Sequence, residues 1–317
     1  MAAEPMERHR WYAILSWSVL AFTTLVIAGG AVVRATGSGA GCGDSWPRCQ
    51  GQLLPTSPGT ETIIEFTHRA MSGAAAIGLI VLVVGAFAVY PRRHRVRTAV
   101  GGALVFYALE ALIGASLVIF GWVDQDGSLG RVLVVPLHLM NTYVLLAWLA
   151  ITAWWSTGFA GPIVTGRERL ARRLAIGAGL LAVVGMFGAW NALADSLFPA
   201  ASLSDGVAAE LSSSAPFLLR VRVIHPLVAV LAGLAVVALA FPVADRTSGW
   251  TRRLGFAVIG LVVVQFFIGV GNLFLLAPVE TQVVHLLVAD GMWVAFVLFT
   301  ASALGDRVSE PALERAA

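Results

Sequence analysis

Residues 65–90, EFTHRAMSGAAAIGLIVLVVGAFAVY, begin with an acid and a histidine and continue as an almost uninterrupted apolar run. Glu65 and His68 are three residues apart and therefore share one face of a helix. A run of about 20 apolar residues is long enough to cross a bilayer. Ionisable side chains beside such a run are costly to bury and are commonly functional. The stretch therefore predicts a membrane helix with a candidate site near one end.

The whole chain has the composition of an integral membrane protein. Hydrophobic residues make up 58% of its 317 residues, and charged residues only 12%. A soluble protein of this length would need more polar surface. All 21 basic residues are arginines that lie in several short segments rather than in one patch, which argues against nucleic-acid binding. Residues 1–10 do not resemble a signal peptide, so we expect a bacterial plasma membrane protein.

Eight apolar windows follow one another along the chain, each long enough to span a bilayer. They are Trp11–Val33, Phe66–Tyr90, Thr98–Gly121, Val132–Trp155, Arg172–Ala194, Val221–Val243, Arg253–Leu276 and Gln282–Leu304. Most arginines fall on one side of this arrangement: Arg8, Arg10, Arg92, Arg93, Arg95, Arg97, Arg167, Arg169, Arg172, Arg173, Arg246, Arg252, Arg253, Arg307 and Arg315. Because positive loops face the cytoplasm, both termini are predicted to be cytoplasmic. The even-numbered helices then begin at the outer surface.

The two halves of the chain resemble each other. Residues 110–114, EALIG, in the third window match residues 265–269, QFFIG, in the seventh. Four histidines also recur in order near the starts of the even-numbered windows: His68, His138, His225 and His285. Such internal similarity indicates a parallel repeat. The sequence thus predicts an all-α membrane protein of two similar four-helix bundles, residues 1–160 and residues 161–317.

The four histidines are predicted to lie toward the outer leaflet at similar depth. Two histidines on two helices of one bundle are what the two axial positions of a haem iron require. A tetrahedral metal site would instead need all four together. A single membrane histidine often only bonds a neighbouring helix, but that explains four matching positions poorly. We therefore expect one haem site in each half.

One charged position distinguishes the halves. Glu65 stands three residues before its histidine, whereas Arg222 holds the matching position in the second half. This difference favours a catalytic role for Glu65, in proton transfer or in stabilising charge on a substrate. The alternative is an interfacial acid that pairs with Arg69. Two other membrane acids, Glu110 and Asp290, are expected to bond across helices and are assigned no chemistry.

Arginines and cysteines mark the outer edge of the predicted bundle. Five arginines there are candidates for binding haem propionates: Arg34, Arg69, Arg131, Arg220 and Arg222. Interfacial anchoring explains any one of them equally well. Cys42 and Cys49 enclose six residues of the first outer loop, where a disulfide can form and persist. A structural staple is the simpler role for them, and thiol exchange is the alternative.

Several of these motifs together resemble the haem A synthase family, in particular its bacterial form with a cysteine pair in the first outer loop. The resemblance extends from the first window to the eighth. Its most specific parts are residues 29–39 (GGAVVRATGSG), the Cys42–Cys49 loop and residues 65–69 (EFTHR), together with the other three histidines.

The resemblance implies an oxidoreductase that converts haem O to haem A for terminal oxidases. One porphyrin methyl group is oxidised by successive hydroxylations, and loss of water leaves a formyl group. It further implies that His225 and His285 bind the iron of a haem b cofactor, that His68 and His138 bind the iron of haem O, and that Glu65 is the essential acid. The cysteine pair falls on the family's disulfide, and haem O synthase is the expected upstream partner.

Two other functions are also compatible with the sequence. A di-haem b-type cytochrome would need the same helices and histidines, although ligands near one leaflet suit transmembrane electron transfer poorly. A non-enzymatic haem carrier would need only binding. The sequence does not identify an electron donor.

Overall fold

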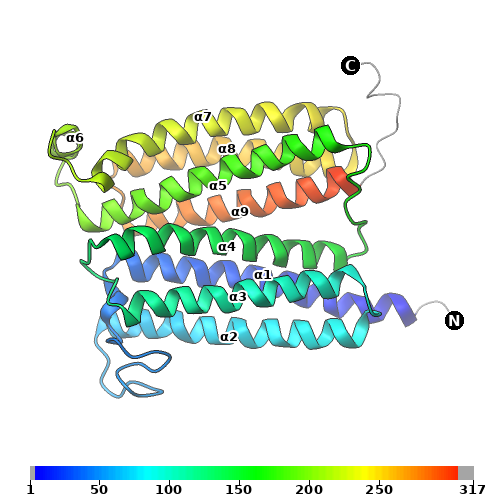
Figure 1. Ribbon diagram of the computed structural model, residues 1–317, viewed down its shortest axis with the longest axis horizontal. Coiled ribbons are helices and arrows are strands. Elements are labelled where there is room, and N and C mark those ends of the chain that lie inside the picture. Colours follow the sequence, from blue (N-terminus) through cyan, green and yellow to red (C-terminus); the bar gives the residue numbers. More distant parts are fainter. Residues whose placement is uncertain (1–3, 306–317) are drawn as a thin grey trace.

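A computed structural model describes residues 4–305, with side chains from Arg10 onward, and is helical throughout apart from its loops (Figure 1). Eight helices are long and apolar enough to cross a membrane, as predicted. They are α1 (Glu4–Ala35), α2 (Thr60–Val89), α3 (Arg95–Ile119), α4 (Leu129–Ser156), α5 (Glu168–Leu197), α7 (Phe217–Asp245), α8 (Gly249–Phe274) and α9 (Val279–Gly305). A 3-10 helix, η1 (Ser38–Ala40), and a short helix, α6 (Leu203–Leu211), lie in the two long loops.

Each long helix begins about one or two turns before its apolar window, whereas its last residue lies close to the end of that window. Helix α2 begins at Thr60, so Glu65 lies inside the same helix as His68, as predicted. The reason for the earlier starts is that hydropathy marks only the part of a helix that is in lipid, whereas the helix itself continues until its end is capped. Two such caps are Ser128, which accepts from the backbone N–H of Arg131, and His94, which accepts from that of Val96.

The long helices lie side by side and alternate in direction (Figure 1). Helices α2, α4, α7 and α9 all begin at the end of the bundle that carries the first loop and α6, on the left of the figure. The arginine-rich connections lie at the opposite end. Of the arginines used to predict orientation, the side chain of Arg8 and all of Arg307 and Arg315 lie outside the described residues, and a cytoplasmic location of the termini stays a prediction.

Helices α1–α4 form one side of the bundle, and α5 and α7–α9 form the other (Figure 1). The two sides meet along α1, α4, α5 and α9. At this seam Tyr143 stacks on Trp293, with ring centroids 4.8 Å apart, and the Trp293 indole N–H donates to the Tyr143 carbonyl oxygen at 2.7 Å. A continuous buried core therefore joins the two sides, while large apolar side chains such as Leu112 and Phe267 point outward, as expected in lipid.

Candidate functional site

All four predicted histidines lie at the same end of the bundle. Each falls within the first ten residues of its helix: His68 in α2, His138 in α4, His225 in α7 and His285 in α9. These four helices run in the same direction (Figure 1). All four side chains are partly buried, so each ring retains some free surface.

Each histidine ring lies against a glycine of a neighbouring helix. A Cβ added at Gly30 of α1 would lie 3.1 Å from Cε1 of His68, and one at Gly188 of α5 would lie 3.3 Å from Cε1 of His225. The other two rings repeat the arrangement against α3 and α8, with closest approaches of 3.7 Å for Gly114 to His138 and 3.3 Å for Gly269 to His285. A missing Cβ gives a flat ring room to lie close to the helix backbone. The same device therefore occurs at corresponding places in both halves.

The histidines group within the halves. His68 and His138 lie on α2 and α4 of one side of the bundle, and His225 and His285 lie on α7 and α9 of the other. In every ring Nδ1 is buried without a hydrogen bond from the described residues. The Glu110 carboxylate approaches one of these atoms, Nδ1 of His138, to 3.3 Å. Paired, partly open imidazoles beside glycines fit the two axial positions of a haem in each half.

Glu65 is held by the first outer loop and by its own helix. Its side chain is 3% exposed. Oε2 accepts from the backbone N–H of Cys42 at 2.7 Å, and Oε1 accepts from the guanidinium of Arg69 one turn along. Cys42 and Cys49 form a disulfide, as predicted, and Arg69 also donates to the carbonyl oxygens of Ser45 and Arg48 inside the disulfide loop. The pairing with Arg69, which was the alternative to a catalytic role for Glu65, is present, and it fixes a buried carboxylate beneath the loop.

The matching position in the second half is also tied to its outer loop, with the charges reversed. Arg222 donates to the carbonyl oxygens of Ala194 and Phe198 at 2.8 and 2.9 Å. It also forms ion pairs with Asp195 at 3.1 Å and with Glu210 of α6 at 3.5 Å. The two halves therefore share a loop-binding position, but only the first half places an acid there.

All five arginines proposed from the sequence to bind propionates have protein acceptors. Arg131 and Arg220 donate to carbonyl oxygens of the loops just before their helices. Arg34 crosses from α1 to the other side of the bundle, where it donates to the carbonyl oxygen of Ala192 at 2.6 Å and to Oε1 of Gln282 at 2.8 Å. Each of these arginines anchors an outer loop or a helix end, and propionate binding stays a prediction.

The two membrane acids without assigned chemistry behave differently. Glu110 bonds across helices, as expected, to Asn141 and Thr142 of α4. Its Oε1 also lies 3.3 Å from Nδ1 of His138. Asp290 is fully buried in α9, and both its carboxyl oxygens lack a hydrogen bond from the described residues. The predicted cross-helix bond is wrong for Asp290, because packing at the seam provides it with no donor.

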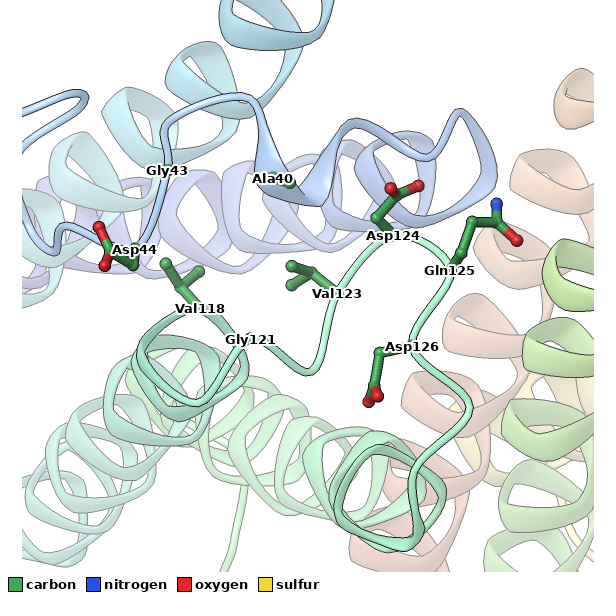
Figure 2. Close-up of a pocket in the computed structure, with 9 residues that line it drawn as sticks. All are labelled: Ala40, Gly43, Asp44, Val118, Gly121, Val123, Asp124, Gln125 and Asp126. Carbon is green, nitrogen blue, oxygen red and sulfur yellow. The ribbon is translucent and has the colours of Figure 1, made fainter.

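A cavity of about 420 Å³ opens between the first outer loop and the α3–α4 loop (Figure 2). Asp44, Asp124 and Asp126 stand around it, together with backbone and apolar groups. The Asp126 carboxylate accepts from the hydroxyl of Ser128 at 2.6 Å. None of the predicted site residues lines this cavity, and clustered acids alone do not define a site. We therefore place the candidate site at the histidines and not in this opening.

Sequence reasoning missed the glycines and the role of Glu110 as a neighbour of His138. The signal was present: Gly114 and Gly269 close the two matching pentapeptides, and Gly30 and Gly188 are spaced much like the histidines they face. Nothing in a single sequence, however, states which side chain a membrane glycine contacts.

The fold and the site define a class: polytopic membrane proteins with four histidines at one end of an eight-helix bundle. Within that class, the chain belongs to the COX15-CtaA family, described as cytochrome oxidase assembly protein, whose family model matches residues 13–297. A Thermus thermophilus protein named protoheme IX farnesyltransferase is 45% identical over 291 residues, which are 91% of this chain and 48% of that protein.

Shorter matches join the chain to proteins named Heme A synthase. The one from Exiguobacterium is 37% identical over 143 residues, 45% of each chain, and the one from Bacillus cereus is 38% identical over 112 residues, 35% of each chain. The chain thus spans about half the length, or less, of the curated relatives it matches.

Proposed function

We propose that this protein is a haem A synthase of the plasma membrane, which oxidises a methyl group of haem O to a formyl group. The observation that carries the proposal is a pair of histidines in each half, with each ring against a glycine of a neighbouring helix. In the first half a buried acid, Glu65, stands three residues before one of these histidines. Family membership and the similarity to proteins named Heme A synthase support it. The sites would face the outer leaflet.

Each half would have its own task. Residues 161–317 would hold haem b through His225 and His285, and this cofactor would supply electron transfer when bound. Residues 1–160 would hold the substrate haem O between His68 and His138. The support for this division is the acid found in the first half, since two halves with one common task would not need to differ there.

The protein's own groups would position the substrate and manage charge. The glycines at positions 30 and 114 leave room for the two imidazoles to approach the iron of haem O. Glu65 is held by the Cys42 backbone N–H and by Arg69, which together hold both of its carboxylate oxygens. A fixed carboxylate can stabilise positive charge that develops on a substrate, or accept a proton from it, without reorganising.

The Thermus relative bears on the partner. Its printed name concerns farnesyl transfer to protohaem, and more than half of that protein lies outside the match. The Thermus protein therefore combines a homologue of this chain with further sequence, and it carries the name of a farnesyltransferase. This combination supports a functional link between this chain and the enzyme that makes haem O. We therefore propose haem O synthase as the upstream partner. The electron donor is left unassigned.

The test is to purify the full chain after expression with haem O synthase and to identify its extracted pigments. Haem b together with haem O or haem A is expected, and haem b alone would indicate a cytochrome or a carrier instead. Glu65→Ala is expected to keep a low-spin b-type spectrum while haem A is no longer formed. An unchanged yield of haem A in that variant would reject the catalytic role of Glu65.

The division between the halves has its own control. His225→Ala and His285→Ala are each expected to abolish the low-spin haem b signal. Survival of that signal in either variant would reassign the cofactor to the other half.

A further inference from the structure

The two matching pentapeptides place different residues beside the histidines. Glu110 and Gln265 both stand on the third helix of their half, four residues before the glycine that contacts a histidine ring. In the first half that ring is His138, and in the second half it is His285. The positions are equivalent, but one carries a carboxylate and the other a neutral amide. This difference is independent of the one between Glu65 and Arg222.

In the first half the carboxylate faces the imidazole. Glu110 Oε1 lies 3.3 Å from Nδ1 of His138, within ion-pair distance but without a hydrogen bond between the two atoms. Oε2 accepts from the amide of Asn141 at 2.5 Å, and Thr142 Oγ1 lies 2.5 Å from Oε1. The Asn141 amide is held in turn by the carbonyl oxygen of Phe106 at 2.9 Å. Glu110 is therefore anchored at both oxygens, with one of them directed at the ring.

In the second half the amide binds the backbone instead. Gln265 Nε2 donates to the carbonyl oxygen of His285 at 3.0 Å, and its Oε1 is buried without a hydrogen bond from the described residues. This contact fixes helix α9 against α8. It brings no negative charge to the imidazole of His285.

The chemical effect of a carboxylate at the second nitrogen of an axial histidine is known in general terms. It keeps the proton on Nδ1, leaves Nε2 for the metal, and makes the imidazole a stronger donor. A stronger donor favours ferric over ferrous iron, and hydrogen bonding around an axial ligand is one of the ways by which a protein sets a haem potential. A neutral amide on the backbone exerts no such effect.

We infer that Glu110 is a positioning residue that acts through His138 and lowers the midpoint potential of the iron bound in the first half. The inference rests on the proposed function, because it takes His138 as a ligand of the haem O iron. It goes beyond that function, since it makes the two sites unequal in potential although each holds two histidines.

The test is a redox titration of the purified full chain loaded with haem b and haem O, followed by absorbance. Glu110→Gln gives the first half the residue found in the second. The absorbance component that persists in His285→Ala belongs to the haem of the first half. In Glu110→Gln the midpoint potential of this component is expected to rise, and the midpoint potential of the second-half component is expected to stay unchanged. Glu110→Asp, whose shorter side chain withdraws the carboxylate, is expected to shift the same component in the same direction and serves if Glu110→Gln does not fold.

Gln265→Ala is the matched structural control. It removes the hydrogen bond from Nε2 to the carbonyl oxygen of His285 and removes no charge, so the unfolding temperature is expected to fall while the midpoint of the component that persists in His285→Ala stays constant. An unchanged midpoint in the folded Glu110 variants overturns the inference. So does a shift confined to the component that His285→Ala removes, or an equal shift of the persisting component in Gln265→Ala. Failure of the proposed function would give a different result: the wild-type protein would make no haem A from haem O.

Discussion

Replacing Gly30 by alanine tests the contact between a missing Cβ and a histidine ring. The new Cβ would lie 3.1 Å from Cε1 and 3.3 Å from Nε2 of His68, tighter than ordinary van der Waals contact. The ring must therefore move by a few tenths of an ångström or the helices must separate. At Gly114 the same change meets His138 only at 3.7 Å, and at Gly101 it meets no atom within 4 Å. The three substitutions form a graded series of one chemical type.

The expected magnitudes follow from two opposing effects. Alanine in place of glycine in a helix interior stabilises by about 0.5–1 kcal/mol. Overpacking a close contact costs about 1–3 kcal/mol. Gly101→Ala and Gly114→Ala should therefore gain about 0.5–1 kcal/mol, whereas Gly30→Ala should lose about 1 kcal/mol. If displacing the His68 ring costs about 1.4 kcal/mol in binding, haem O affinity falls roughly tenfold.

The assay is unfolding of the three purified variants in one detergent, combined with an absorbance titration by haem O. Gly101→Ala controls for the intrinsic effect of alanine on a membrane helix. The reasoning is refuted if Gly30→Ala is as stable as Gly101→Ala and binds haem O with wild-type affinity. A loss of the same size in all three variants would also refute it, because only one of the contacts is tight.

Three further variants have expected outcomes. Replacing Cys42 and Cys49 together by serine should lower stability by about 2.5 kcal/mol in the chain-entropy model, and adding reductant to the wild type should match that loss in an unfolding measurement. Asp290→Leu should raise stability by about 1–3 kcal/mol, because it removes a buried carboxyl without hydrogen-bond donors, and a fall in unfolding temperature would contradict this. Arg34→Met should cost about 2–4 kcal/mol through its lost bonds to Ala192 and Gln282, and unchanged unfolding would show that these bonds do not stabilise the seam.

The eight-helix fold could be predicted from hydropathy alone, because lipid requires long apolar segments whose backbone bonds are internal. The helix ends could not, since capping and loop contacts decide them. The start of α2 at Thr60 shows this, because it lies well before the predicted apolar window that begins at Phe66.

Residue types and their positions in the internal repeat were enough to predict which residues form the candidate site. The four histidines and their grouping by halves follow from the repeat. Their surroundings depend on contacts between residues far apart in sequence, such as Arg34 with Gln282, which no single-sequence pattern reports. Asp290 shows the opposite case: its position in the sequence suggests a cross-helix bond, but packing leaves it without a hydrogen-bond donor among the described residues.

The common direction of α2, α4, α7 and α9 has a consequence for energetics. Their histidines lie at one end of the bundle, so in the proposed enzyme an electron passing from one site to the other would travel along the plane of the membrane. A charge that crosses the full bilayer gains or loses about 2.3 kcal/mol per 100 mV of membrane potential. A lateral path crosses almost none of that field. The rate of electron transfer between the two sites should therefore be the same in an energised cell and in a vesicle without a membrane potential.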